Sequence, residues 1–254
     1  MAAPLSPLGA NSTAWRKLER DYALSPVRGV ERDVTASGVR VRVAEEGSGP
    51  HVVLLHGLFT DGSTWDRVAG ALARDYHVVV PDLPGFGASE KPAPQRFPYG
   101  VDAFVESMAD LYAGLELGRA SVVGHGLGGA IALSLAARHP ELVARLVLID
   151  ALCGPMRPGL WGRLVHWPFV GGFVLKQLWG RPVFRSFYRE RVLSPHAKVP
   201  LERVDAYYES FSEPAARGSA LATLRSVNDT RPLAAARKLI ARSGLRVAET
   251  RAAP

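Results

Sequence analysis

One short segment, Gly124-His125-Gly126-Leu127-Gly128-Gly129, constrains the fold of this chain more than any other. It follows an apolar run at residues 120–123 that is typical of a buried strand, and it precedes a run rich in Ala and Leu at residues 130–138 that favours a helix. Glycine adopts backbone conformations and permits close contacts that side chains forbid. The four glycines therefore predict a tight turn that joins a strand directly to a helix.

Three further segments occur in a fixed order around this turn. Residues 51–57 form an aliphatic run that ends in His56-Gly57, residues 78–89 form a second run followed by a loop from Asp82 to Ser89, and residues 146–150 form a third that ends in Asp150. With the glycine-rich turn in the place of a G-x-S-x-G nucleophile elbow, the chain resembles the α/β-hydrolase family over about residues 30–235.

The resemblance implies an α/β-hydrolase fold, a mostly parallel sheet flanked by helices with a helical cap inserted after the sixth strand. The sequence pattern agrees, because near-continuous aliphatic strands suit a parallel sheet that is buried on both faces. Alternation around Ser37-Gly38 predicts an initial hairpin over residues 30–44. Helices are expected over residues 63–74, 101–115, 127–138, 213–227 and 232–242.

The expected organisation has four parts: a lead-in at residues 1–28, the hydrolase core at 29–153, the helical cap at 154–213, and return helices with an irregular tail at 214–254. The cap region is rich in aromatic residues, which either wall an apolar substrate pocket or simply pack the cap onto the core. The residues expected to contact substrate are Phe59, His125, Trp161, Trp167 and Phe173.

The C-terminal part departs from the family pattern. The resemblance implies two more strands, a catalytic acid and a catalytic histidine, but no histidine follows His196 and the residues from Ser243 onward show no amphipathic period. We therefore expect the last two strands to be missing. The sixth strand, at residues 146–149, would then be an exposed apolar edge. Three consequences stay open: an unstable chain, self-association through this edge, or completion of the sheet by another polypeptide.

The nucleophile position of the elbow holds Gly126, which has no side chain with which to attack a substrate. The backbone of an elbow is strained at this position, and glycine tolerates that strain best, so the turn should survive while the chemistry is lost. Gly126 is either a genuine loss of the nucleophile or a sequence error or engineered replacement in an active family.

The other catalytic groups are only partly represented. The expected oxyanion-hole donors are the backbone N–H groups of Leu58 and Leu127, and such donors alone can leave an acceleration of ~10³-fold over water. Asp150 occupies a position where some family members carry the acid, but with no histidine to orient we interpret it as structural. His56 and Asp82 are also expected to be structural, and His125 is expected to point away from the reacting centre.

Composition narrows the remaining possibilities. The single cysteine, Cys153, fits a reducing compartment, and the first ten residues do not resemble a secretory signal, so we expect a cytoplasmic protein. Residues 1–150 carry a net charge of −3 and residues 151–254 carry +10. We interpret this as an arginine-rich solvated surface rather than a nucleic-acid or membrane-binding face, since no nucleic-acid motif or uninterrupted transmembrane run accompanies it. Weak contact with a membrane surface stays open. No metal or cofactor motif occurs, so none is expected.

These observations predict an α/β-hydrolase-family protein related to hydrolases of small, largely apolar esters or similar substrates. The chain is expected to be catalytically impaired, because its nucleophile position is Gly126 and the C-terminal acid and histidine are not found. Two alternatives stay open: a non-catalytic ligand-binding or interaction protein that reuses the pocket, and a degenerate gene fragment.

Overall fold

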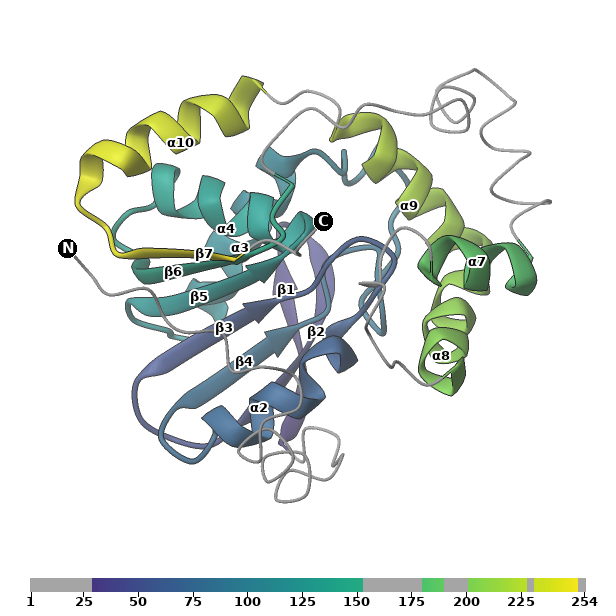
Figure 1. The fold of residues 1–254 in the computed structure, drawn as a ribbon, viewed down its shortest axis with the longest axis horizontal. Helices are drawn as coiled ribbons and strands as arrows, with labels where there is room; N and C mark the ends of the chain where they lie inside the picture. The colour runs from purple at the N-terminus through teal and green to yellow at the C-terminus, as the bar shows by residue number, and fades with distance from the viewer. Residues whose placement is uncertain (1–28, 153–179, 190–200, 228–230, 251–254) are drawn as a thin grey trace.

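The computed structural model describes residues 29–152, 180–189, 201–227 and 231–250. Seven strands form one sheet in the order β1-β2-β4-β3-β5-β6-β7 (Figure 1). The pairs β1–β2 and β2–β4 are antiparallel, and the four pairs from β4–β3 to β6–β7 are parallel. The strands are β1 Val30–Ala36, β2 Val39–Glu46, β3 His51–Leu55, β4 His77–Pro81, β5 Ala120–His125, β6 Val143–Ile149 and β7 Val247–Thr250.

Helices alternate with the strands from β3 to β6, as the sequence pattern predicted, and four more lie between β6 and β7 in the described ranges. The helices are η1 Gly62–Trp65, α2 Asp66–Leu72, α3 Val101–Gly114, α4 Leu127–Arg138, α7 Arg181–Phe187, α8 Leu201–Ser212, α9 Pro214–Ser226 and α10 Arg231–Ser243. The helix expected over residues 63–74 is therefore a short 3-10 turn followed by a helix of two turns. The initial hairpin is confirmed, with Ser37 and Gly38 at positive φ between β1 and β2.

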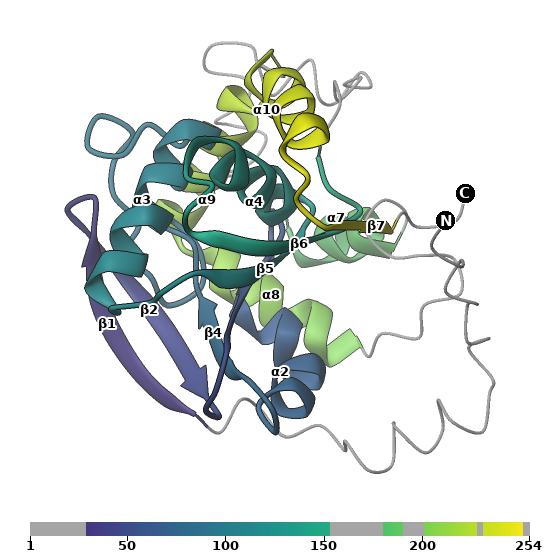
Figure 2. The ribbon, with the colours of Figure 1, turned by 90° about the vertical axis from the view of Figure 1, so that its left-hand side faces the viewer.

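The two faces of the sheet are buried by different helices, because successive side chains of a strand point to opposite faces. Val53 and Leu55 of β3 belong to the large core cluster with α3 and α4, whereas Val52 and Leu54 pack with Trp65 and the short helix α2. Figure 2 shows α3, α4 and α10 on one side of the sheet and α2 on the other. Both faces of β3 are buried, which explains why its sequence is an unbroken aliphatic run.

The tail after α10 corrects one prediction. We expected residues from Ser243 onward to be irregular and the strand at 146–149 to be an exposed edge, but Val247–Thr250 forms β7, which runs parallel to β6 and covers it. The Arg246 carbonyl accepts from Leu146 N–H at 3.1 Å, and the Thr250 carbonyl accepts from Asp150 N–H at 2.8 Å. Backbone pairing forms this strand without an apolar side-chain pattern, so hydrophobic periodicity did not reveal it.

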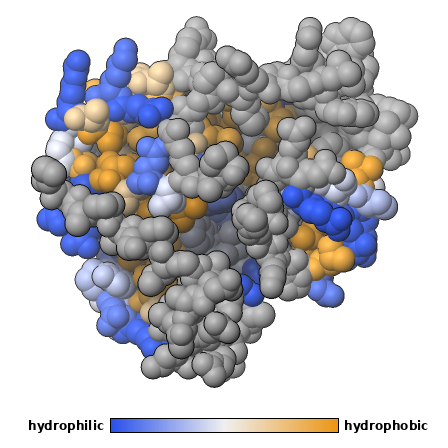
Figure 3. Space-filling view, viewed as in Figure 1, coloured by the Kyte–Doolittle hydropathy of each residue, from blue (hydrophilic) through white to orange (hydrophobic). Residues whose placement is uncertain are grey.

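The outer strand at this end of the described sheet is therefore β7, all four residues of which are exposed. Val247 is 42% exposed and Leu239 on α10 is 56% exposed. Figure 3 shows orange apolar surface interrupted by blue polar side chains over the part of this face where Figure 1 labels α10 and β7. Within the described part of the chain, no helix is both long and apolar enough to cross a membrane.

Candidate functional site

The glycine-rich turn between β5 and α4 has the geometry of an elbow. Gly126 lies at φ 54° and ψ −113° and immediately precedes the first residue of α4. Its N–H donates to the Ile149 carbonyl at 3.1 Å, and its carbonyl accepts from Leu152 N–H at 3.0 Å. The turn is thus held by backbone hydrogen bonds to the end of β6, which do not require a side chain at position 126.

The glycines of the turn are needed for different physical reasons. A Cβ at Gly124 or Gly128 would lie 2.3 Å from a backbone carbonyl oxygen, and one at Gly129 would lie 2.5 Å from the Ala151 Cβ. These three positions have no space for a side chain. A Cβ at Gly126 would meet only the Gly57 Cα, at an ordinary 3.7 Å. Position 126 therefore has room for a side chain, and only its positive φ favours glycine.

The expected oxyanion-hole residues lie on two turns that meet. Leu127 is the first residue of α4, so its N–H has no acceptor within the helix. Leu58 follows Gly57 in the turn after β3, and Gly128 N–H donates to the His56 carbonyl at 3.1 Å, which joins this turn to the elbow. Phe59, next in the turn, lies at φ 62°. The two turns are adjacent, as an oxyanion hole between them would require.

His56 is a buried structural residue. Its Nε2 accepts from Leu83 N–H at 2.9 Å, so the ring proton lies on Nδ1, which donates to the Gly57 carbonyl at 2.8 Å. The ring therefore joins the turn after β3 to the loop after β4. With both nitrogens hydrogen-bonded, His56 cannot accept a proton from a residue at position 126.

His125 lies on the other side of Gly57. Its buried Nδ1 has no hydrogen-bond partner among the described residues, and it lies 2.8 Å from the point that a Gly57 Cβ would occupy. Burial lowers the pKa of His125, with a smaller opposing effect from the Asp150 carboxylate. The imidazole is thus held in its neutral form against the turn after β3.

Asp150 and Asp82 differ in their surroundings. Asp150 is exposed at the end of β6, at φ 45°, and its backbone N–H bonds the Thr250 carbonyl. Asp82 instead accepts from Gly62 N–H and Ala88 N–H, each at 2.7 Å. Burial raises the pKa of the Asp82 carboxyl, while the two donors favour its ionised form. Asp82 holds the loop after β4, as its motif predicted.

Aromatic side chains of α7 and α8 pack on the turn after β3. The Phe59 ring makes edge-to-face contacts with Phe187 of α7 and Phe211 of α8, at centroid distances of 5.7 and 5.3 Å. The hollow beneath α8 and α9 at this point measures only about 10 Å³. It is lined by Phe59, Thr60, Gly85, Phe86, Gly87, Tyr207, Ser210, Phe211 and Ala216. The other residues expected to contact substrate, Trp161, Trp167 and Phe173, lie outside the described residues.

A set of polar contacts between α8 and η1 was missed by the sequence reasoning. Asp61 caps η1 by accepting from Ser63 N–H, and its second oxygen accepts from Ser210 Oγ at 3.1 Å. Arg203 of α8 donates to the Ser63 carbonyl at 2.6 Å and to Asp66 at 3.3 Å. An Asp before a helix is a recognisable cap, but partners some 140 residues away leave no local signal.

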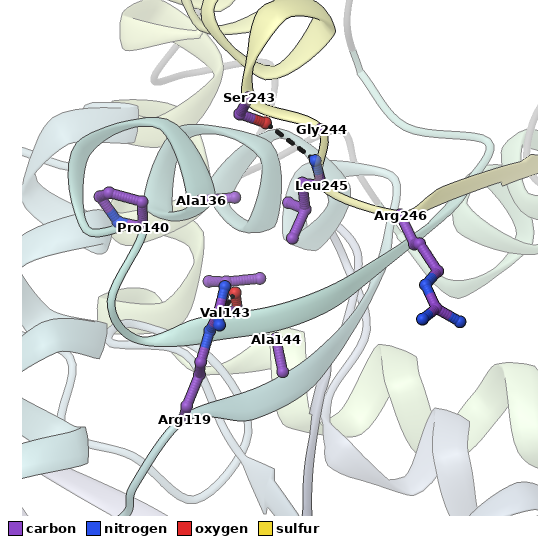
Figure 4. A pocket seen from close by; sticks show the side chains of 9 residues that line it. All are labelled: Arg119, Ala136, Pro140, Val143, Ala144, Ser243, Gly244, Leu245 and Arg246. Carbon is purple, nitrogen blue, oxygen red and sulfur yellow. Dashed lines mark hydrogen bonds between the residues drawn. The ribbon is translucent and has the colours of Figure 1, made fainter.

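A larger cavity, of about 210 Å³, lies at the opposite end of the sheet (Figure 4). It is bounded by the start of β6, the end of α4 and the α10–β7 connection, where Ser243 Oγ accepts from Leu245 N–H at 3.2 Å. Its lining residues are Arg119, Ala136, Pro140, Val143, Ala144, Ser243, Gly244, Leu245 and Arg246. No group of three or more His, Cys, Asp or Glu side chains converges as a metal site in the described ranges.

Known proteins resemble the chain in sequence over about half its length. A mycobacterial protein of uncharacterised function (Mycobacterium tuberculosis) is 40% identical over 52% of this chain and 39% of its own. The 2-hydroxymuconate semialdehyde hydrolase of Pseudomonas sp. strain CF600 is 37% identical over 52% of this chain and 49% of its own. A fluoroacetate dehalogenase from Burkholderia is 37% identical over 49% of this chain and 42% of its own. The matched region is thus less than half the length of these relatives.

Solved structures share the fold over more of the chain. The haloalkane dehalogenase DatA of Agrobacterium tumefaciens C58 superposes with a TM-score of 0.73, covers 87% of this chain and 79% of its own, and is 20% identical. An epoxide hydrolase from Vigna radiata superposes with a TM-score of 0.70, covers 87% of this chain and 78% of its own, and is 24% identical. A family model described as the alpha/beta hydrolase fold matches residues 50–220. The chain belongs to the α/β-hydrolase fold family.

Proposed function

We propose that this chain keeps the scaffold of a hydrolase for small, largely apolar substrates but is catalytically impaired, because position 126 supplies no nucleophile. The observation that carries the proposal is Gly126 itself, which lies at φ 54° between β5 and α4 with its backbone hydrogen bonds made. Covalent hydrolysis of an ester needs a side-chain nucleophile at this point. A glycine keeps the turn and removes that step.

The surroundings of the elbow add a second impairment. A serine nucleophile needs a base within hydrogen-bond reach. Near the elbow, within the described ranges, His56 has both nitrogens engaged and His125 is packed with its Nδ1 against Gly57. A serine introduced at position 126 would therefore lack a partner to take its proton.

The substrate class is proposed from the aromatic wall and from the relatives. Phe59, Phe187 and Phe211 present apolar rings beside the turn after β3. Relatives with 37% identity are named as a semialdehyde hydrolase and a dienoate hydrolase, whose substrates are small organic molecules. The elbow sequence with Leu127-Gly128-Gly129 is most similar to serine members, so the ancestral reaction was acyl transfer to water.

The proposal is tested by following p-nitrophenyl ester turnover and thermal unfolding on the same purified chain. We expect cooperative unfolding and a rate no more than ~10³-fold above that of buffer, the level that oxyanion donors alone support. An esterase that turns over p-nitrophenyl esters serves as the active control. Enzyme-level turnover by this chain would show that the catalytic residues are elsewhere.

The variant Gly126→Ser tests the second impairment, with Gly126→Ala as its control for any structural effect. Both variants are expected to stay at the rate of the parent chain, because neither His56 nor His125 can accept a proton from the new hydroxyl. If Gly126→Ser alone restores turnover and Gly126→Ala does not, the missing nucleophile is the only defect and the proposed absence of a base is wrong.

A further inference from the structure

We infer that the chain binds a divalent late transition metal ion, such as Cu²⁺ or Ni²⁺, between His51 and His77. The two histidines are the first residues of β3 and β4 and are direct register partners in the parallel pair. Side chains of register partners lie on the same face of a sheet. Their Nδ1 atoms are 2.9 Å apart, and both side chains are only partly buried, so an ion can reach them from solvent.

The surroundings of His77 suit the tautomer of a metal ligand. Its Nε2 lies 3.2 Å from a carboxylate oxygen of Glu45, which can only accept a hydrogen bond. In the tautomer with the proton on Nε2, this N–H faces the carboxylate and the lone pair of Nδ1 is directed toward His51. Metal-bound histidines commonly donate their other ring N–H to a carboxylate in this way, which orients the ring and raises its basicity.

Glu45 is itself held in place. Arg32 donates from its guanidinium to both carboxylate oxygens of Glu45 across the β1–β2 pair. The order of contacts is thus Arg32, Glu45, His77 and His51. Such a chain leaves little freedom for the His77 ring, so its Nδ1 is positioned before any ion arrives.

One proton now occupies the place that the ion would take. With the His77 proton on Nε2, Nδ1 of His51 is the donor of the hydrogen bond between the two rings. When an ion binds both Nδ1 atoms, this proton moves to Nε2 of His51, so that each ring keeps one proton. The step breaks one N–H···N hydrogen bond and two metal–water bonds, forms two metal–nitrogen bonds, and requires no change in oxidation state.

The distance between the nitrogens selects the type of ion. Two nitrogens that each lie ~2.0–2.1 Å from a metal are about 2.9 Å apart at a right angle and about 3.4 Å apart at a tetrahedral angle. The observed 2.9 Å corresponds to neighbouring positions of a square-planar or tetragonal ion. The ring planes meet at 71°, and each ring turns about its Cβ–Cγ bond to direct its lone pair at the ion.

Two protein ligands make an exchangeable site. No third His, Cys, Asp or Glu of the described residues joins the group, so water completes the coordination shell. The order of affinity should follow the general series for nitrogen ligands, with Cu²⁺ above Ni²⁺ and Zn²⁺. The site lies at the start of the strands, whereas Gly126 follows the end of β5, so it is independent of the proposed function.

The test is Cu²⁺ titration of the full chain without an affinity tag, followed by isothermal calorimetry and by the nitrogen hyperfine pattern in electron paramagnetic resonance. Relative to the parent chain, His51→Gln and His77→Gln should each lose one bound ion or bind it at least ~10-fold more weakly. Glu45→Gln should keep the ion with affinity reduced by ~10-fold, as is typical when the carboxylate behind a ligand is replaced.

His139→Gln is the matched control. His139 is also partly buried and also faces carboxylates, those of Glu106 and Glu141 at 3.6 and 3.4 Å, but no second histidine ring contacts it among the described residues. This variant should bind as the parent does. Equal affinity and stoichiometry in the parent and in His51→Gln would overturn the inference. If His77→Gln fails to fold, the comparison of His51→Gln with His139→Gln still decides.

Discussion

At the scale of single residues, alanine substitutions of the elbow glycines should reduce the free energy of unfolding by different amounts. Gly126→Ala places a Cβ in open space but at φ 54°, so we expect a loss of about 1–3 kcal/mol in the free energy of unfolding. Gly118→Ala, where a Cβ meets nothing within 4 Å and φ is ordinary, should change little. Gly128→Ala should be the most damaging, because its Cβ would lie 2.3 Å from the Leu55 carbonyl oxygen.

Urea denaturation of the three variants in parallel provides the measurement. The expected order of stability is Gly118→Ala, then Gly126→Ala, then Gly128→Ala. Equal stability of the first two would show that the backbone at position 126 relaxes without strain, and the elbow would then be looser than its hydrogen bonds to residues 149 and 152 indicate.

The burial of His125 should make the stability of the folded chain depend on pH. Burial lowers its pKa in the folded state, so the unfolded chain binds a proton to this residue more readily than the folded chain does. By linkage, its contribution to stability is present above the pKa of about 6.5 that a histidine has in the unfolded chain, and it is lost as the pH falls below that value. We expect the free energy of unfolding to decrease between pH 7.5 and 5.5 in the parent chain.

The variant His125→Gln isolates this residue from other titrating groups. Its free energy of unfolding, measured by urea denaturation at the same pH values, should fall less steeply than that of the parent. Identical slopes would mean that the His125 pKa is the same in the folded and unfolded chains. His139→Gln, which removes a more exposed histidine, serves as the comparison.

At the scale of elements, the position of the exposed edge changes the prediction about self-association. Because β7 covers β6, the outer strand at this end of the described sheet is β7, whose four residues are all exposed. Exposed edges pair with other strands unless charge or proline prevents it. We expect concentration-dependent dimers in analytical ultracentrifugation, and we expect Val247→Lys to weaken them by about tenfold.

Leu239→Lys is the control for this prediction. It removes an apolar side chain of α10 that is more exposed than Val247, but it leaves the strand edge unchanged. Dimers that persist in Leu239→Lys and disappear in Val247→Lys identify the edge as the interface. The reverse result would assign association to the apolar surface of α10, and a monomer at all concentrations would contradict both.

The elements also show what the sequence could and could not predict. Strands such as His51–Leu55 were predictable because they are buried on both faces. The turn at 124–129 was predictable because close packing requires three of its glycines and a positive φ favours the fourth. Val247–Thr250 was not predictable, since it is exposed and has no apolar pattern. The contact between Asp61 and Ser210 was equally hidden, because it depends on how α8 docks and not on local sequence.

At the scale of the whole molecule, α8 joins η1 and the turn after β3 through both polar and apolar contacts. Arg203 and Ser210 bond η1 and its N-terminal Asp61, while Phe211 is only 4% exposed and contacts Phe59 and Phe184. Contacts of both kinds in one helix favour unfolding of α8 together with the sheet. We therefore expect a single thermal transition in calorimetry.

Phe211→Ala tests this coupling. Removal of a buried phenylalanine costs about 3–5 kcal/mol, and in a chain of this size each kcal/mol lowers the Tm by roughly 2–4 °C. If α8 and the sheet unfold as one unit, the whole transition should move to lower temperature while remaining single. Val183→Ala on α7, where the side chain is 47% exposed, should leave the Tm nearly unchanged. A second, lower transition that appears only in Phe211→Ala would show that α8 melts separately from the sheet, because the polar contacts to η1 do not hold α8 without the aromatic ones.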